Sequence, residues 1–243
     1  MATDKARSRH MTLPSQNAWW IDGDNYALVL DGTKTAAVNI GSLNTTEKED
    51  YLVEAWFKAD KQQDGAASVL STVKMDLRLN AQGKMELDVN GSSAEGYNKD
   101  LRDGQWHHVA VNVLKSTNGM GTVYVDGLQC KQISASAMPE LFGDKLMLGG
   151  RRNQVSNGVY TFSQQMKGAI DEVRIWKGRR TADVINSNMY VRVKADEPGL
   201  VAYYPLEKLT KDAYNQIVTT GTFDNSVSKN SAAEQLSCFD ADG

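Results

Sequence analysis

The chain contains 243 residues, of which 41% are hydrophobic and 23% are charged, with a formal net charge of −3 at pH 7. This composition is typical of a soluble globular protein, and the length suits one all-β domain with tails. The small negative charge offers no basic field for nucleic acid or for an anionic membrane surface. No apolar run approaches the roughly 20 residues that span a bilayer, so we expect no membrane insertion.

The two ends of the chain differ in composition from its middle. Residues 1–15 are polar and lack the apolar segment of a signal peptide, so we interpret them as a tag-like or disordered N-terminus. We expect residues 16–208 to form one domain. Residues 209–243 are rich in Asn, Ser, Thr and Asp, which predicts an extra strand, a linker to a neighbouring module, or both.

Short β-rich runs, separated by Asp-Gly and Asn-Gly pairs, fill the middle of the chain. These dipeptides tolerate the positive φ angles of tight hairpins. In residues 84–89, Met85, Leu87 and Val89 share one face, whereas the charged residues share the other, which is typical of a half-buried strand. Many short strands between turns predict an antiparallel sandwich or barrel.

One segment departs from the strand pattern. Thr181 can cap a short helix near residues 181–189, with Asp183 in its first turn. The side chains expected to face inward from this segment are those of Val184, Ile185 and Met189.

Two adjacent histidines, His107 and His108, follow Trp106. Adjacent residues of a strand point to opposite faces, so the two imidazoles cannot bind one metal ion. We therefore interpret the pair as part of a strand, with one imidazole packed inside against a backbone carbonyl and the other on the surface. The two cysteines, Cys130 and Cys238, leave open whether a disulfide joins them.

Seven segments, taken together, resemble laminin-G-like, concanavalin A-like jelly-roll domains. In chain order they are YALVLDG, DYLVEAWFKAD, DGQWHHVAVNV, GTVYVDGLQ, KLMLGG, MKGAIDEVRIWKGRRTADVI and LVAYYPLE. The resemblance covers about residues 18–208 and implies an all-β fold, an antiparallel two-sheet β-sandwich (jelly roll) with the one short helix. It also places Trp56, Trp106 and Trp176 in family-like strands, where we expect them to fill the space between the sheets. Lectins, adhesion modules, carbohydrate-binding modules and hydrolases share this fold, so the resemblance does not choose among them.

The resemblance also implies a calcium ion at the rim of the sandwich. Ca²⁺ takes six to eight oxygen ligands, and Asp31 and Asp171 lie in family-like segments. Asp22 and Asp24, in the stretch IDGDN, are further candidate ligands. The alternative is that these side chains cap their own turns.

Residues 151–165 join two family-like strands and are long for a hairpin connection, so we expect a recognition loop. Planar donors beside aromatic rings suit glycan hydroxyls or acidic groups. The predicted ligand-binding residues are Arg151, Arg152, Asn153, Tyr160 and Phe162, with Tyr97 as a second choice. A solvated, variable loop is the alternative.

Catalysis is the less favoured hypothesis. One glucanase branch of the fold carries E-x-D-x-E on a strand, and the nearest match here is Glu86, Asp88 and Asn90. Because Asn cannot donate a proton as a general acid, we predict no enzyme activity.

The predicted function is a non-catalytic binding or adhesion module, extracellular or on the cell surface, as one module of a larger multidomain protein. It would recognise a glycan, or else an extracellular protein, at rim loops, with Ca²⁺ as a candidate cofactor. A structural spacer and a glycoside hydrolase are the alternatives.

Overall fold

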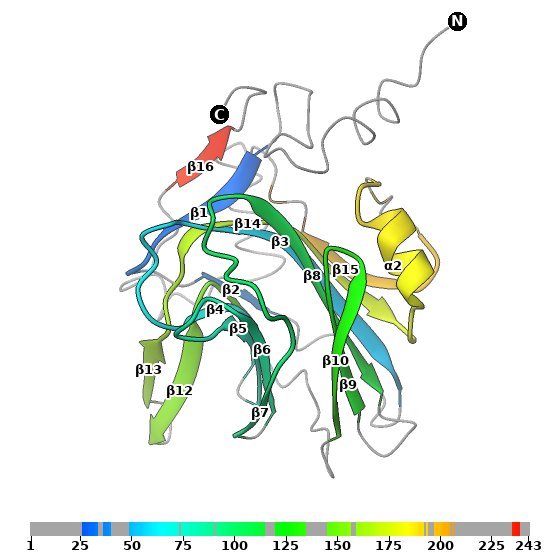
Figure 1. Cartoon of the computed structure of the whole chain (residues 1–243), viewed down its shortest axis with the longest axis horizontal. Helices are drawn as coiled ribbons and strands as arrows, with labels where there is room; N and C mark the ends of the chain where they lie inside the picture. The colour runs from blue at the N-terminus through cyan, green and yellow to red at the C-terminus, as the bar shows by residue number, and fades with distance from the viewer. Residues whose placement is uncertain are drawn as a thin grey trace, which may run out of the picture.

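The computed structural model shows two antiparallel β-sheets, one arching over the other (Figure 1). This confirms the predicted sandwich, including its one short helix among the described residues. The residues that the structure describes are 26–33, 36–39, 49–72, 74–89, 91–114, 120–134, 145–156, 159–191, 193, 197–204, 206 and 235–238.

The larger sheet contains eight of the described strands. Across the sheet they are β10 (Leu128–Ser134), β9 (Met120–Val125), β8 (Trp106–Leu114), β3 (Tyr51–Ala59), β14 (Lys167–Lys177), β1 (Tyr26–Asp31) and β16 (Gln235–Cys238), with β15 (Leu200–Tyr204) also beside β14. The eleven residues of β14 pair with β1 along the first part of the strand and with β15 along the last part. The C-terminal strand β16 thus lies at the β1 edge, and β10 lies at the opposite edge.

The strand order also separates the two cysteines. Cys130 lies on β10 and Cys238 on β16, at opposite edges of the larger sheet. Neighbouring strands are about 4.8 Å apart, so six strand spacings separate these edges by far more than a disulfide can span. Cys130 is a free thiol, and its burial raises the pKa of that thiol.

The smaller sheet contains six of the described strands. Across the sheet they are β2 (Ala36–Asn39), β11 (Lys145–Leu148), β4 (Ala67–Ser71), β5 (Met75–Leu79), β6 (Met85–Val89) and β7 (Ser92–Glu95). A separate hairpin follows β11 and consists of β12 (Arg151–Ser156) and β13 (Val159–Ser163). The predicted recognition loop over residues 151–165 was therefore wrong as a loop, because most of that segment forms a β-hairpin. The sequence signal for a hairpin was the pair Asn157–Gly158 between the two strands.

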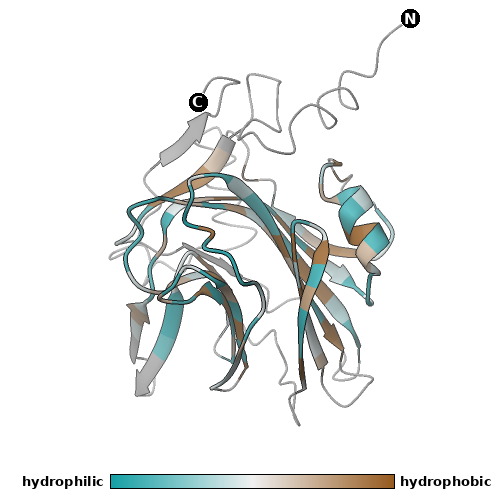
Figure 2. Ribbon diagram, in the orientation of Figure 1, coloured by the Kyte–Doolittle hydropathy of each residue, from teal (hydrophilic) through white to brown (hydrophobic). Residues whose placement is uncertain are grey.

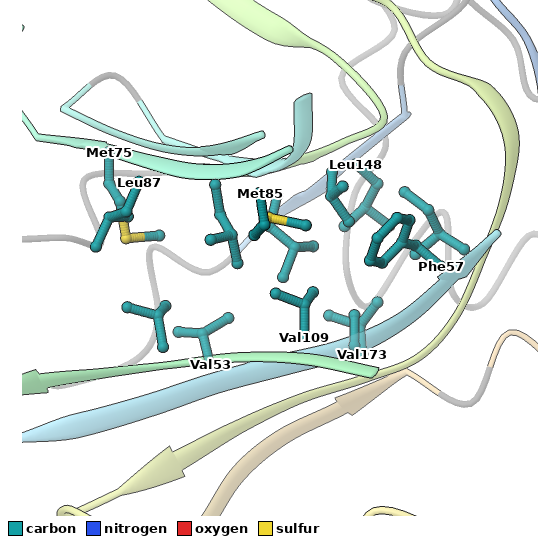
Figure 3. Close-up of a cluster of buried hydrophobic side chains, with 14 of the residues drawn as sticks. Val53, Phe57, Met75, Met85, Leu87, Val109, Leu148 and Val173 are labelled. Atoms are coloured by element: carbon teal, nitrogen blue, oxygen red, sulfur yellow. The ribbon is translucent and has the colours of Figure 1, made fainter. Parts of the chain in front are cut away.

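The core lies between the two sheets (Figure 3). Met75, Met85 and Leu87 point into it from the smaller sheet, and Val53 and Val109 meet them from the larger sheet. Each of these side chains is at most 1% exposed. The alternation predicted for residues 84–89 is confirmed, since every second residue of β6 enters this core.

The tryptophans lie on the other side of the larger sheet. Trp56, Trp106 and Trp176 belong to two buried clusters that are separate from the main core. The expectation that they fill the space between the sheets was wrong: they share the strand face with His108 and Glu54, away from the smaller sheet. The physical reason is the pleat, which sends neighbouring residues to opposite faces.

A short helix lies on this outer face, beside the larger sheet in Figure 1. It is α2 (Ala182–Asn188), and the Thr181 side chain accepts a hydrogen bond from the backbone N–H of Val184, as the sequence predicts. Ile185 and Met189 are buried against the sheet, whereas Val184 is only half-buried. In the ribbon of Figure 2, α2 carries both hydrophilic and hydrophobic residues, and hydrophobic residues recur along the strands of both sheets. No helix in the described part of the chain is long and apolar enough to cross a membrane.

A buried polar network fixes α2 to the larger sheet. Arg174 donates to the backbone oxygens of Asn188 (3.1 Å) and Val191 (2.9 Å) and forms an ion pair with Glu172. Trp56 Nε1 donates to the Met189 oxygen at 3.0 Å. The backbone oxygens just after α2 are therefore satisfied by the sheet beneath them.

We predict that Leu87→Ala lowers the free energy of unfolding by about 2–5 kcal/mol, because it removes buried methyl groups and leaves a cavity between the sheets. Urea denaturation measures this cost. Leu128→Ala is the matched control, because Leu128 is 63% exposed, and it should change stability by no more than about 0.5 kcal/mol. Equal costs for the two variants would contradict the placement of the core.

Candidate functional site

The outer face of the smaller sheet carries alternating charged residues. On β5 and β6, Asp76, Arg78, Glu86 and Asp88 occupy the positions between the core-facing residues. The register places Asp76 opposite Asp88 and Arg78 opposite Glu86. Since residues opposite each other in an antiparallel pair have Cβ atoms only about 5 Å apart, these four side chains interact directly.

Arg78 lies at the centre of this group. Its Nε donates to Glu86 Oε1 at 3.0 Å, and its Nη2 also contacts that oxygen. Its Nη1 lies 3.4 Å from Asp76 Oδ2, and its Nη2 lies 3.5 Å from Asp88 Oδ2. One guanidinium therefore compensates three carboxylates, which would otherwise repel one another.

A second arginine reaches the same carboxylates from the hairpin. Arg151 Nη1 lies 3.4 Å from Asp76 Oδ2 and 3.8 Å from Asp88 Oδ1. We call Asp76, Arg78, Glu86, Asp88 and Arg151 the outer-face charge cluster. The cluster joins β5, β6 and the start of β12, so it fixes the hairpin beside the outer face.

Two serines of β4 hold the ends of the hairpin. Ser71 Oγ donates to the Gly150 oxygen at 2.8 Å, and Ser68 Oγ donates to Gln164 Oε1 at 3.1 Å. Both serines are fully buried. The β4 side of the outer face is therefore covered.

Burial differs strongly across the outer-face charge cluster. Asp76 is fully buried, and the side chain of Asp88 is 7% exposed, whereas Arg78 and Glu86 are each 14% exposed. Burial raises the pKa of Asp76, and the neighbouring Ser68, Arg151 and Arg78 lower it by less. Burial alone would lower the pKa of Arg78, but its carboxylate neighbours outweigh it and raise the pKa. Arg78 therefore stays charged.

The face opens toward β7. Ser93 and Glu95 on this edge strand are exposed. Lys84 Nζ pairs with Glu95 Oε1 at 3.0 Å, and both side chains are about one-third or more exposed. A ligand would meet this side of the cluster first.

The other predicted ligand-binding residues do not all join this face. Arg152 is 4% exposed, and Asn153 Nδ2 donates to Ser163 Oγ at 2.8 Å within the hairpin. Phe162 is half-buried opposite Arg152. The side chain of Tyr160 lies outside the described residues. Tyr97 packs against the core, so the structure does not place it beside Arg151.

Two of the predicted calcium ligands, Asp31 and Asp171, lie in the described part of the chain, and they lie apart from each other. Asp31 ends β1 opposite Lys167, four residues from Asp171 along β14, so about 13 Å separates their positions. Asp31 Oδ1 accepts hydrogen bonds from the backbone N–H and the hydroxyl of Thr33, as in the turn-capping alternative, and Asp171 is fully buried. Asp22 and Asp24 lie outside the described residues. These two described aspartates do not fit one shared ion, and calcium binding stays a prediction.

The two histidines of β8 diverge, as the strand interpretation requires. His107 Nδ1 lies 2.9 Å from Asp126 Oδ2, and its Nε2 lies 3.2 Å from Asp103 Oδ1. His108 Nε2 lies 3.4 Å from Glu54 Oε2 on the opposite face. Both histidines face carboxylates, so the predicted backbone-carbonyl partner was wrong. In the part of the chain that the structure describes, no three His, Cys, Asp or Glu residues are grouped to hold a metal ion.

The geometry also bears on the hydrolase hypothesis. Glu86 and Asp88 share the outer face, but Arg78 contacts both of them. Asp76 has a raised pKa, as a general acid requires, yet it is fully buried and cannot reach a glycosidic oxygen. The cluster therefore offers no exposed proton donor for glycoside cleavage.

We predict that Arg78→Met lowers the free energy of unfolding by about 3 kcal/mol at pH 7, because it leaves three carboxylates without their central cation. The loss should shrink at pH 4, where the variant's carboxylates gain protons on folding. Urea denaturation at both pH values measures it. Arg102→Met is the control, because its partner Asp100 is 51% exposed, and it should cost about 1 kcal/mol or less. A loss that does not depend on pH would contradict the electrostatic role.

We predict that His107→Gln destabilises the protein by about 1 kcal/mol at pH 5.5 and by less at pH 9. Burial alone would lower the pKa of His107, but Asp126 and Asp103 outweigh it and raise the pKa. A raised histidine pKa contributes stability that is present below pH 6.5 and is lost as the pH rises through the folded pKa. Chemical denaturation at the two pH values tests this. The control Leu128→Ala removes no titratable group, so it should change the free energy of unfolding by the same amount at both pH values.

The comparisons with known proteins agree with this fold. The sequence profile of the Concanavalin A-like lectin/glucanases superfamily matches residues 31–186. No curated protein matches the sequence significantly. The structure is similar to a candidate carbohydrate-binding protein from Bacteroides ovatus ATCC 8483, with a TM-score of 0.59 and 19% identity over 76% of this chain and 52% of that chain. This chain thus spans about half the length of that protein.

A second similar structure is the CBM40 of the Ruminococcus gnavus IT-sialidase. It has a TM-score of 0.51 and 12% identity, over 66% of this chain and 95% of that chain. Identities this low show a shared fold and no more. The profile match shows the family as well as the fold, because it covers more than half of the sequence. The chain belongs to the Concanavalin A-like lectin/glucanases superfamily.

Proposed function

We propose that the protein is a carbohydrate-binding module whose ligand lies against the outer face of the smaller sheet. The outer-face charge cluster carries the proposal, because it gathers hydrogen-bonding groups on a β-sandwich face that points away from the core. Glycan hydroxyls both donate and accept hydrogen bonds, so they complement carboxylates and guanidiniums together. The similar folds of a candidate carbohydrate-binding protein and of the CBM40 of a sialidase support the same function.

This proposal moves the binding site from the rim loops to the strand face beside the hairpin β12–β13. Among the predicted ligand-binding residues, Arg151 lies where the hairpin meets the strand face. A binding module of this kind acts by equilibrium recognition, with no chemical step. We further propose that it works outside the cell or on its surface within a larger protein, as the resemblance to laminin-G-like modules implies.

Binding to a broad panel of immobilised glycans, followed by calorimetry with each glycan retained, tests the function. We expect at least one glycan to bind, and we expect Arg151→Ala to weaken its affinity about tenfold, because a charged hydrogen-bond donor leaves the face. Arg179→Ala is the control, since Arg179 is exposed in the connection between β14 of the larger sheet and α2. Repeating the titration with EDTA and then with millimolar Ca²⁺ tests the calcium prediction.

Two outcomes would contradict the proposal. If no glycan of the panel binds, the structural-spacer alternative gains. If a glycan binds equally well to the Arg151→Ala variant, its site lies elsewhere on the molecule.

A further inference from the structure

The arginines of the outer-face charge cluster already face carboxylates. Each nitrogen of the Arg78 guanidinium lies within hydrogen-bond distance of Asp76, Glu86 or Asp88. Arg151 Nη1 lies between Asp76 and Asp88. A carboxylate or sulfate on a ligand needs a free guanidinium edge for a bidentate contact. The Arg78 fork that would supply such a contact is already occupied by the protein's own carboxylates.

Hydrogen-bond acceptors, in contrast, remain available. The cluster holds three carboxylates and two guanidiniums, so its formal charge is 2 − 3 = −1. Each ionised carboxylate has about four acceptor positions. Of the three, Glu86 is the one a ligand reaches most readily, because its side chain is 14% exposed, whereas Asp76 is fully buried and the side chain of Asp88 is 7% exposed.

The exposed end of the face, beside β7, is also rich in carboxylates that accept hydrogen bonds. Glu95 is 42% exposed there, and Lys84, the cation beside it, is paired with that glutamate. Glu86 lies opposite Glu95 on the neighbouring strand. A ligand that approaches across β7 therefore meets two carboxylates on adjacent strands, Glu86 paired with Arg78 and Glu95 paired with Lys84.

We propose, resting on the function proposed above, that the outer-face charge cluster selects sugars that donate hydrogen bonds and carry no negative charge. Neutral hydroxyl-rich sugars and amino sugars share this chemistry. Sugars that carry a carboxylate or a sulfate are excluded, because their charge repels Glu86 and Glu95 and their oxygens find no unoccupied fork at Arg78. The selectivity is electrostatic, so salt weakens it.

Amide NMR shifts of the full chain during titration with three matched monosaccharides test this selectivity. The probes are D-glucosamine, D-glucose and D-glucuronate, each at millimolar concentrations and constant ionic strength. We expect saturable shifts on β5, β6 and β7, with a Kd for glucosamine at least tenfold below that for glucuronate. The Kd for glucose should lie between those two values. A glucose Kd close to that of glucosamine would show that hydroxyl groups donate the recognised hydrogen bonds, whereas a much weaker glucose would show that the amine does.

A variant and its control assign the effect to the cluster. Glu86→Gln should reduce the ratio of the glucuronate Kd to the glucosamine Kd severalfold, because it removes one carboxylate from the side of the cluster that faces β7. Asp100→Asn removes a carboxylate that is also paired with an arginine but lies outside the cluster, and it should leave the ratio unchanged. Equal narrowing by both variants would overturn the proposal, because the effect would then come from net charge alone.

The remaining outcomes separate this inference from the proposed function. A glucuronate Kd equal to or below that of glucosamine, or no saturable shift with any of the three sugars, overturns the inference, whatever the glycan panel shows. Discrimination of the three sugars at β5 and β6, together with a glycan panel that is empty, supports the charge selectivity but contradicts the proposed binding of larger glycans.

Discussion

The pleat of β5 and β6 is the constraint on which both the core and the candidate site depend. Leu77 and Leu87 face each other in the core, and the next residues on their strands must therefore face outward. Those residues include Asp76 and Asp88, which the register places directly opposite each other. Like charges in that position destabilise a sheet unless a cation lies between them. Arg78 is that cation, so the packing of the core and the chemistry of the outer face have one geometric origin.

The two sheets use their outer faces differently. On the larger sheet, Trp176 Nε1 donates to Glu54 Oε1 at 2.7 Å, and Arg174 donates to backbone oxygens at and beyond the end of α2. Burial alone would raise the pKa of Glu54, but His108 and Arg174 outweigh it and lower the pKa. That face is closed and its polar groups fix the helix in place. The smaller sheet keeps part of its charged face exposed beside β7, where Lys84 and Glu95 pair at the surface.

Local patterns in the sequence predicted what depends on neighbours in the chain. The alternation in residues 84–89 gave β6, and the Thr181 cap gave α2, because both follow from the period of one element. The partnership of Arg78 with Glu86 was not predicted, since it depends on the register between two strands. Asp76 escaped notice for the same reason: its burial and its cross-strand partner Asp88 are invisible to the pattern of β5 alone. The hairpin over residues 151–163 did have a local signal in the sequence, the pair Asn157–Gly158. We nevertheless expected a loop, because the segment is long for a hairpin connection.

Membership of the superfamily fixes the sandwich but leaves the ligand undetermined, because the outward positions of the strands can change without disturbing the core. In this chain those positions hold three carboxylates around Arg78 and a second arginine delivered by β12. The network around Arg174 has a structural role, because it fixes α2 to the larger sheet. The outer-face charge cluster instead holds one more carboxylate than guanidiniums, and it borders the exposed Glu95 on the edge strand β7. The ligand proposed above would donate hydrogen bonds to those carboxylates, whereas the network around Arg174 already has the end of α2 as its partner.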